Sequence, residues 1–140
     1  MKATELMIAD YVSHEGEPYM IRQLGIYGED RDGEDYPAVC IGKPKGVGLI
    51  VGRDEIKPIP LTTEILERNG WSYNDEDAKF AAGTWSGGGL ILQQTDDGFM
   101  IVVTSDYDDE DTNHTPFILR YVHELQHALR LKHSDKEITL

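Results

Sequence analysis

Residues 89–104 read GLILQQTDDGFMIVVT, and this stretch decides the class of fold. Two strand-sized apolar runs flank an Asp97-Gly98 pair, which is a sequence signal for the positive φ angles of a tight hairpin turn. We therefore predict antiparallel strands at 89–95 and 98–104. A third strand is expected at 78–85, before the glycine run at 87–89.

The N-terminal half of the chain adds more short β segments. They are expected at residues 8–13, 18–25, 38–42 and 47–51, separated by charged or glycine-rich turns. Four or five short strands of this kind predict a small SH3-like β-barrel over residues 1–60.

Two helices are expected in the second half. A Thr cap, acidic residues in the first turn and a closing Asn69-Gly70 predict a short helix at 63–69. Thr115-Pro116 predicts the start of an amphipathic helix that runs to about residue 132. Its apolar stripe consists of Ile118, Tyr121, Val122, Leu125 and Leu129. Residues 137–140 can add a short edge strand.

These elements together predict an α+β fold. Residues 61–140 are expected to contain the short helix, an antiparallel three-stranded sheet and the C-terminal amphipathic helix. We expect this segment to pack with the SH3-like subdomain of residues 1–60 as one compact unit.

The composition excludes several classes of protein. The chain has 140 residues, 39% of them hydrophobic and 28% charged, which is typical of one globular domain. A net charge of −13 disfavours direct binding of nucleic acid or of an anionic membrane. No apolar run approaches the ~20 residues of a membrane span. The start of the chain lacks the pattern of a signal peptide, and a single cysteine, Cys40, fits a reducing compartment, so we expect a cytoplasmic protein.

The acidic residues are concentrated in residues 29–35, 75–77 and 106–111. Such runs are usually solvated loops that aid solubility. A second interpretation is that they form a decoy surface, in which carboxylates on a rigid scaffold imitate phosphates and occupy a basic groove on another protein.

Residues 123–127 match the HExxH pattern of zinc proteases. In those enzymes two histidines one helical turn apart ligate zinc, and the glutamate activates the bound water. His123, Glu124 and His127 have that spacing, and His133 stands where metzincins have a third histidine. The pattern therefore predicts His123, His127 and His133 as metal ligands and Glu124 as the catalytic base.

Three observations favour a polar surface or a partner-binding face over a zinc site at the same residues. Arg130 stands where metzincins have the glycine that lets the chain turn the third histidine back to the metal. Only seven residues follow His133 in this sequence, so we expect neither a methionine turn nor a downstream ligand helix. On a regular helix His123 and His127 are expected opposite the apolar stripe, on the solvated face that carries Arg120 and Arg130.

Four stretches, found at residues 5–12 (ELMIADYV), 59–62 (IPLT), 69–71 (NGW) and 121–126 (YVHELQ), resemble a family of uncharacterised proteins encoded by phages and prophages of Bacteroides-type bacteria. The last motif of that family reads Tyr-Val-His-Gln-Leu-Gln-Asn, from which this chain departs at Glu124 and His127. The resemblance implies an origin in a mobile element and a family that does not depend on zinc. It implies no reaction.

We therefore expect a non-enzymatic phage or prophage accessory protein that binds a host component, without a cofactor, and interferes with a host defence system. Its partner is expected to be a host protein with a basic surface, bound by the acidic loops, or a small anionic ligand such as a signalling nucleotide. The residues expected to bind the anionic ligand are Trp85, Arg120, His123, His127 and Arg130. A homo-oligomer is compatible with the sequence. The alternative is a zinc-dependent hydrolase or peptidase that uses residues 123–127.

Overall fold

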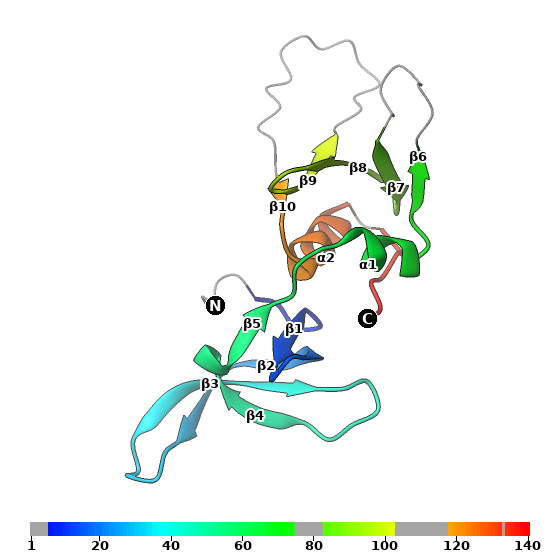
Figure 1. Ribbon diagram of the computed structural model, residues 1–140. Helices are drawn as coiled ribbons and strands as arrows, with labels where there is room; N and C mark the ends of the chain where they lie inside the picture. The colour runs from blue at the N-terminus through cyan, green and yellow to red at the C-terminus, as the bar shows by residue number, and fades with distance from the viewer. Residues whose placement is uncertain (1–5, 75–82, 103–117, 133) are drawn as a thin grey trace. The chain divides into compact units, whose positions relative to one another are not determined.

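The computed structural model describes residues 6–74, 83–102, 118–132 and 134–140. In this part of the chain two five-stranded antiparallel sheets and two short α-helices make up the fold (Figure 1). The chain divides into two compact units, Met1–Ile59 (unit 1) and Pro60–Leu140 (unit 2). The predicted antiparallel sheets and helices are confirmed, although strands dominate more than an α+β fold implies.

Unit 1 contains one sheet with the strand order β4-β3-β2-β1-β5. Its strands are β1 (Tyr11–His14), β2 (Glu17–Glu29), β3 (Asp35–Gly42), β4 (Leu49–Gly52) and β5 (Ile56–Pro58). A 3-10 turn, η2 (Arg53–Glu55), follows β4 and leads the chain to the far edge of the sheet, where β5 pairs with β1. In the described residues no ladder joins β4 to β5, so the predicted barrel is not closed by hydrogen bonds.

The long strand β2 pairs with two neighbours and has an irregular register with one of them. Its first residues pair with β1 and the rest with β3, and the register with β3 shifts between Ile21 and Gln23 and again between Gln23 and Ile26. Such shifts mark β-bulges, which bend a strand and increase its twist. Gly25 has a φ of 70° within the second shift, a backbone angle that favours glycine.

The core of unit 1 lies on one face of this bent sheet. Its members are the buried apolar residues Leu6, Val12, Ile21, Val39, Ile41, Val51 and Ile56. Burying each of these side chains contributes roughly 1.5–3 kcal/mol. The small core is therefore consistent with an independently compact unit.

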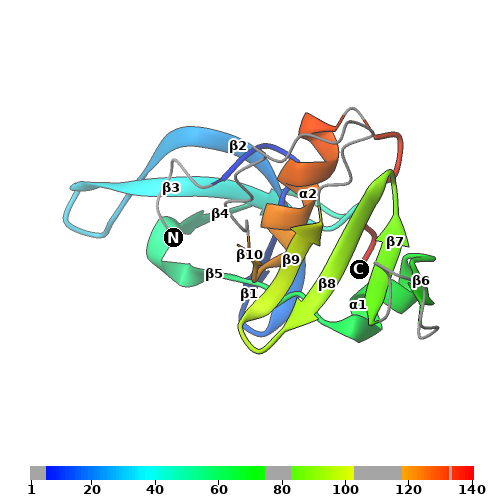
Figure 2. The ribbon, with the colours of Figure 1, turned by 90° about the horizontal axis from the view of Figure 1, so that it is seen from above.

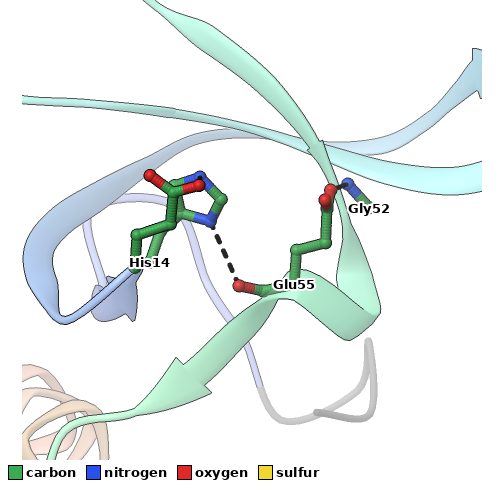
Figure 3. A network of polar contacts seen from close by, with 4 residues as sticks. His14, Gly52 and Glu55 are labelled. Carbon is green, nitrogen blue, oxygen red and sulfur yellow. Dashed lines mark hydrogen bonds and ion pairs between the residues drawn. The ribbon is translucent and has the colours of Figure 1, made fainter.

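His14 ties the β1–β2 turn to η2 (Figure 3). Its buried ring places Nδ1 3.1 Å from the carbonyl oxygen of Glu55, and the Glu55 carboxylate accepts a hydrogen bond of 2.7 Å from the Gly52 N–H. The turn itself uses Glu15 and Gly16, both with positive φ. This pattern matches the twist of a two-residue hairpin turn. His14 thus has a structural position in unit 1.

Unit 2 contains the second sheet, with the order β10-β9-β8-β7-β6. Its strands are β6 (Ser72–Asn74), β7 (Thr84–Gly87), β8 (Leu90–Thr95), β9 (Gly98–Val102) and β10 (Ile118–Leu119). The helices α1 (Thr63–Arg68) and α2 (Val122–Leu131) lie on one face of this sheet (Figures 1 and 2). Their residues Leu66, Val122, Leu125 and Leu129 are almost fully buried.

The predicted hairpin at the centre of unit 2 is confirmed, but its turn differs from the expected one. Thr95 pairs with Gly98, so Asp96 and Asp97 are the turn residues, and neither has a positive φ. Gly98 has a φ of 151°, and a Cβ atom there would lie 2.5 Å from the carbonyl oxygen of Leu119. Gly98 is therefore required by the close approach of β10 rather than by the turn.

Two further predictions for unit 2 are wrong in extent. The sheet has five strands rather than three, because the short segments β6 and β10 pair with its two edges. The C-terminal helix begins at Val122 and not near residue 115, since Ile118 and Leu119 pair with Met100 and Phe99 of β9. The expected positions 78–82, 103–104 and 115–117 lie outside the described residues.

Helix α1 agrees closely with its prediction. Thr62 caps it by accepting a hydrogen bond from the Ile65 N–H, and the chain leaves it at Asn69 and Gly70. The Asn69 side chain then exchanges two hydrogen bonds with the backbone of Thr139, of 2.6 and 3.0 Å. Residues 137–140, which we expected could add a short edge strand, form no strand and are held in part by the Asn69 side chain.

No helix in the described part of the chain is long and apolar enough to cross a membrane.

Candidate functional site

Glu124, the glutamate of the HExxH segment, closes the N-terminus of α2. Because α2 begins at Val122, Glu124 is its third residue, and its Oε1 accepts hydrogen bonds of 3.0 Å from the backbone N–H groups of Arg120 and Tyr121. A glutamate at this position satisfies N–H groups that lack an intrahelical partner. The carboxylate thus turns back along the chain, towards the residues that precede the helix.

The two histidines of the segment lie next to each other in a row of aromatic rings. The rings of Tyr121 and His123 are stacked, with centroids 5.8 Å apart and planes 7° apart. The His123 and His127 rings meet edge to face at 5.6 Å. His123 is only 4% exposed, so the prediction that it lies on a solvated face is wrong, whereas His127 is half-buried. The buried face of α2 also includes Gln126 and is therefore wider than the predicted apolar stripe.

The third predicted ligand, His133, lies outside the described residues. In the described ranges, no group of three or more His, Cys, Asp or Glu side chains is gathered so that it could hold a metal ion. The helix is uninterrupted at Ala128. It continues to Leu131 and ends with hydrogen bonds from Lys132 N–H to the Ala128 carbonyl and from Ser134 N–H to the Leu129 carbonyl.

Trp85 is part of the core of unit 2. It lies on β7, is 5% exposed, and pairs across the sheet with Tyr73 and Leu92. Its ring centroid is 4.9 Å from that of the half-exposed Tyr73. Trp85 therefore offers little surface on which a ligand could stack.

Arg120 is exposed and lines a groove in unit 2 with a volume of 390 Å³. The other walls are the approach to α1 at residues 60–63 and the β8–β9 turn with its flanks at residues 94–99. The Arg120 backbone is fixed on both sides: its N–H donates to Glu124, and its carbonyl accepts 2.9 Å from the Leu61 N–H. Arg130, the remaining predicted binding residue, is half-buried in the last turn of α2 and does not line this groove.

The structure therefore does not gather the predicted binding residues into one site. His123 and His127 are adjacent, Trp85 contacts Tyr73, and Arg120 belongs to a groove with residues that the sequence analysis did not select. Those missed residues include Thr63, Gln94, Asp96 and Asp97. The sequence signal nearest to them is the Asp97-Gly98 pair, which predicts a hairpin turn and not a binding site.

In unit 1, the first of the predicted acidic runs forms the tip of the β2–β3 hairpin (Figure 1). The Asp30 carboxylate accepts hydrogen bonds of 2.9 Å from the N–H groups of Asp32 and Glu34, and the Asp30 N–H donates to the Glu34 carbonyl at 3.0 Å. These bonds hold the turn in one shape. The acidic runs at residues 75–77 and 106–111 lie outside the described residues.

Opposite charges meet in unit 1 at the β3–β4 turn. Lys43 Nζ donates to the Glu17 carboxylate at 2.7 Å and lies 5.2 Å from the centre of the Tyr19 ring. The hydrogen bond from Lys43, together with its positive charge, lowers the pKa of Glu17, and the same bond raises the pKa of Lys43. Both groups are exposed, so the pair is a small, salt-sensitive contribution to stability.

Comparison with known proteins gives no match to a family model, to a curated protein or to a solved structure.

Proposed function

We propose that this chain is a non-enzymatic accessory protein of a phage or prophage, which acts in the cytoplasm of its bacterial host by binding a basic surface of a host protein. Interference with a host defence system is the role that fits such a partner. The mobile-element origin rests on the resemblance of the four sequence stretches at residues 5–12, 59–62, 69–71 and 121–126.

The observation that carries the proposal is the acidic tip of the β2–β3 hairpin, residues 29–35. It holds five carboxylates and one guanidinium, which leaves a net charge of −4. All seven residues are exposed, and the Asp30 hydrogen bonds keep the backbone of the turn in place. Carboxylates carried by a turn with a fixed backbone cost less entropy on binding than those of a disordered segment, and their charge attracts a basic surface from a distance.

For unit 1 we propose an SH3-like fold. Support comes from the strand order β4-β3-β2-β1-β5, from the bend in β2 and from the 3-10 turn that precedes the last strand. In this fold the β2–β3 hairpin is supported by the sheet only at its base, which suits a binding loop.

The alternative candidate is a zinc-dependent hydrolase or peptidase. Its support is the spacing of His123, Glu124 and His127 and the contact between the two histidine rings. The hydrogen bonds of Glu124 to Arg120 and Tyr121 weigh against it, because a catalytic base must face the bound water rather than the helix start. Binding of a small anion loses support for a similar reason, since Trp85 and His123 are buried.

The experiment is a capture of host proteins with matched charge variants. In the tip variant the five acids of residues 29–35 are replaced by their amides, which keeps an acceptor oxygen at Asp30. In the control variant five exposed acids elsewhere are replaced in the same way: Asp54, Glu64, Glu67, Asp135 and Glu137. Each immobilised protein is exposed to a lysate of a Bacteroides-type bacterium at low and at high salt, and retained proteins are identified by mass spectrometry.

We expect the wild type and the control variant to retain the same basic protein at low salt, and the tip variant to lose it. Retention by the wild type should fall as salt rises, because exposed charges are screened. Equal retention by the tip variant and the wild type, or no basic protein retained by the wild type, contradicts the proposal.

A further inference from the structure

The groove in unit 2 that contains Arg120 has the size of a small-molecule site. Its volume of 390 Å³ lies near the lower end of the range for ligand pockets, about 300–1,000 Å³. Leu61 and Phe99, which line it, are almost fully buried and give it an apolar base. A ligand that fills this volume is small.

The walls of the groove are held by backbone hydrogen bonds. Arg120 is anchored to Leu61 and, through the Glu124 carboxylate, to the start of α2. The β8–β9 turn is closed by the Thr95 hydroxyl, which donates to the Gly98 carbonyl at 3.1 Å. The charged residues of the groove therefore extend from fixed backbone positions, as a preorganised site requires.

Opposite charges line this groove without pairing to each other. Arg120 carries the positive charge, and Asp96 and Asp97 carry two negative charges at the turn. Within the described residues, neither the guanidinium nor either carboxylate forms an ion pair or a side-chain hydrogen bond. Arg120 and the two aspartates thus line one groove without a salt bridge between them.

We propose that the groove binds a small zwitterion, namely a free amino acid or a dipeptide. Its ammonium group contacts the Asp96 and Asp97 carboxylates, and its carboxylate accepts hydrogen bonds from the Arg120 guanidinium. A ligand with only one kind of charge meets repulsion on one wall, whereas a zwitterion makes a charge-assisted hydrogen bond on each. The groove is open to water, so the affinity is modest. This inference does not rest on the proposed function, because the acidic tip belongs to unit 1.

The test is an NMR titration of the isotope-labelled full chain with the dipeptide glycyl-leucine. Two analogues serve as ligand controls: N-acetyl-glycyl-leucine, which lacks the ammonium group, and glycyl-leucinamide, which lacks the carboxylate. We expect saturable shifts at residues 60–63, 94–99 and 120 with the dipeptide, and much weaker binding of both analogues.

Protein variants separate the two walls. Arg120→Gln and the double variant Asp96→Asn, Asp97→Asn should each weaken dipeptide binding by about tenfold or more, since each removes a charged hydrogen-bond partner. Arg68→Gln and Asp135→Asn, exposed residues outside the groove, should leave the Kd unchanged. Within the described residues the Arg120 side chain forms no ion pair, and its backbone bonds do not depend on the side chain. The spectrum of each variant verifies that it is folded.

The proposal is overturned if glycyl-leucine causes no saturable shift in the groove. It is equally overturned if both analogues bind as tightly as the dipeptide, or if Arg68→Gln weakens binding as much as Arg120→Gln.

Discussion

Glu124 belongs to a catalytic sequence motif, but in the structure its carboxylate caps the N-terminus of α2. If α2 began near residue 115, as the sequence predicts, Glu124 would lie in the middle of a helix and be available to a bound metal. The helix begins at Val122, which makes Glu124 its third residue and directs its carboxylate to the N–H groups of Arg120 and Tyr121. The sequence signal for such a cap is incomplete, because Tyr121 stands where a Ser or Thr usually marks it.

We predict that Glu124→Ala lowers the free energy of unfolding by about 1 kcal/mol, the usual effect of losing a helix cap. Glu124→Gln should restore most of the loss, since its amide oxygen can still accept both hydrogen bonds. Glu67→Ala, an exposed glutamate in α1, serves as the matched control and should change stability by less than about 0.5 kcal/mol. Urea unfolding measures all three. Equal stability of Glu124→Ala and the wild type would show that the cap has no energetic role.

His123 departs from its prediction for a related reason. The apolar stripe of Val122, Leu125 and Leu129 is indeed buried, but the buried face extends to His123 and Gln126. A hydrophobic pattern marks the centre of a buried face and does not report how wide it is. His123 stacks on Tyr121, which lies just before the first residue of α2. Helical spacing does not predict where a residue outside the helix lies, so it does not predict this contact.

Helices and strands that depend on neighbouring residues could be predicted from the sequence. Those that depend on pairing with distant residues could not. The β8–β9 hairpin and helix α1 depend on residues close in sequence, and both form close to their predicted ranges, although the hairpin turns at Asp96 and Asp97 rather than at Asp97 and Gly98. The two-residue strand β10 pairs with a strand that precedes it by more than fifteen residues, and no local pattern distinguishes it from the start of a helix. The C-terminal residues likewise depend on Asn69, which lies 70 positions before Thr139.

The Glu17–Lys43 pair links the start of β2 to the β3–β4 turn and makes the stability of unit 1 depend on pH. The pKa of Glu17 is lowered, so its contribution is present above the pKa of the unfolded chain and is lost as pH falls through the folded pKa. The pKa of Lys43 is raised, so its contribution is present below the unfolded pKa and is lost as pH rises through the folded one. The effect is expected to be small because both groups are exposed.

NMR titration of the Glu17 carboxyl group measures this pair directly. We expect the pKa of Glu17 to rise towards its usual range in Lys43→Met and at high salt. Lys45→Met, which removes a lysine from the same turn, should leave it nearly unchanged. The same Glu17 pKa in Lys43→Met and in the wild type would contradict the assignment of the shift to Lys43.

For the whole molecule, the pattern of short strands predicted the architecture, whereas the function predicted from the net charge stays a prediction. Short strands with punctuated turns predicted antiparallel sheets, which is the architecture of both units. The charge of −13 directed attention to the acidic runs, of which residues 29–35 form an ordered tip. The groove around Arg120 escaped prediction because its walls come from three segments that meet only in the folded chain.

The central claim is that the chain acts by binding and that residues 123–127 serve the fold. Zinc linkage tests it most directly, since a metal held by the native protein stabilises that state by mass action. We predict that the urea midpoint of the full chain is the same with a chelator and with excess zinc. A midpoint that rises with zinc, saturates at one ion per chain and loses that rise in His123→Ala would contradict the account.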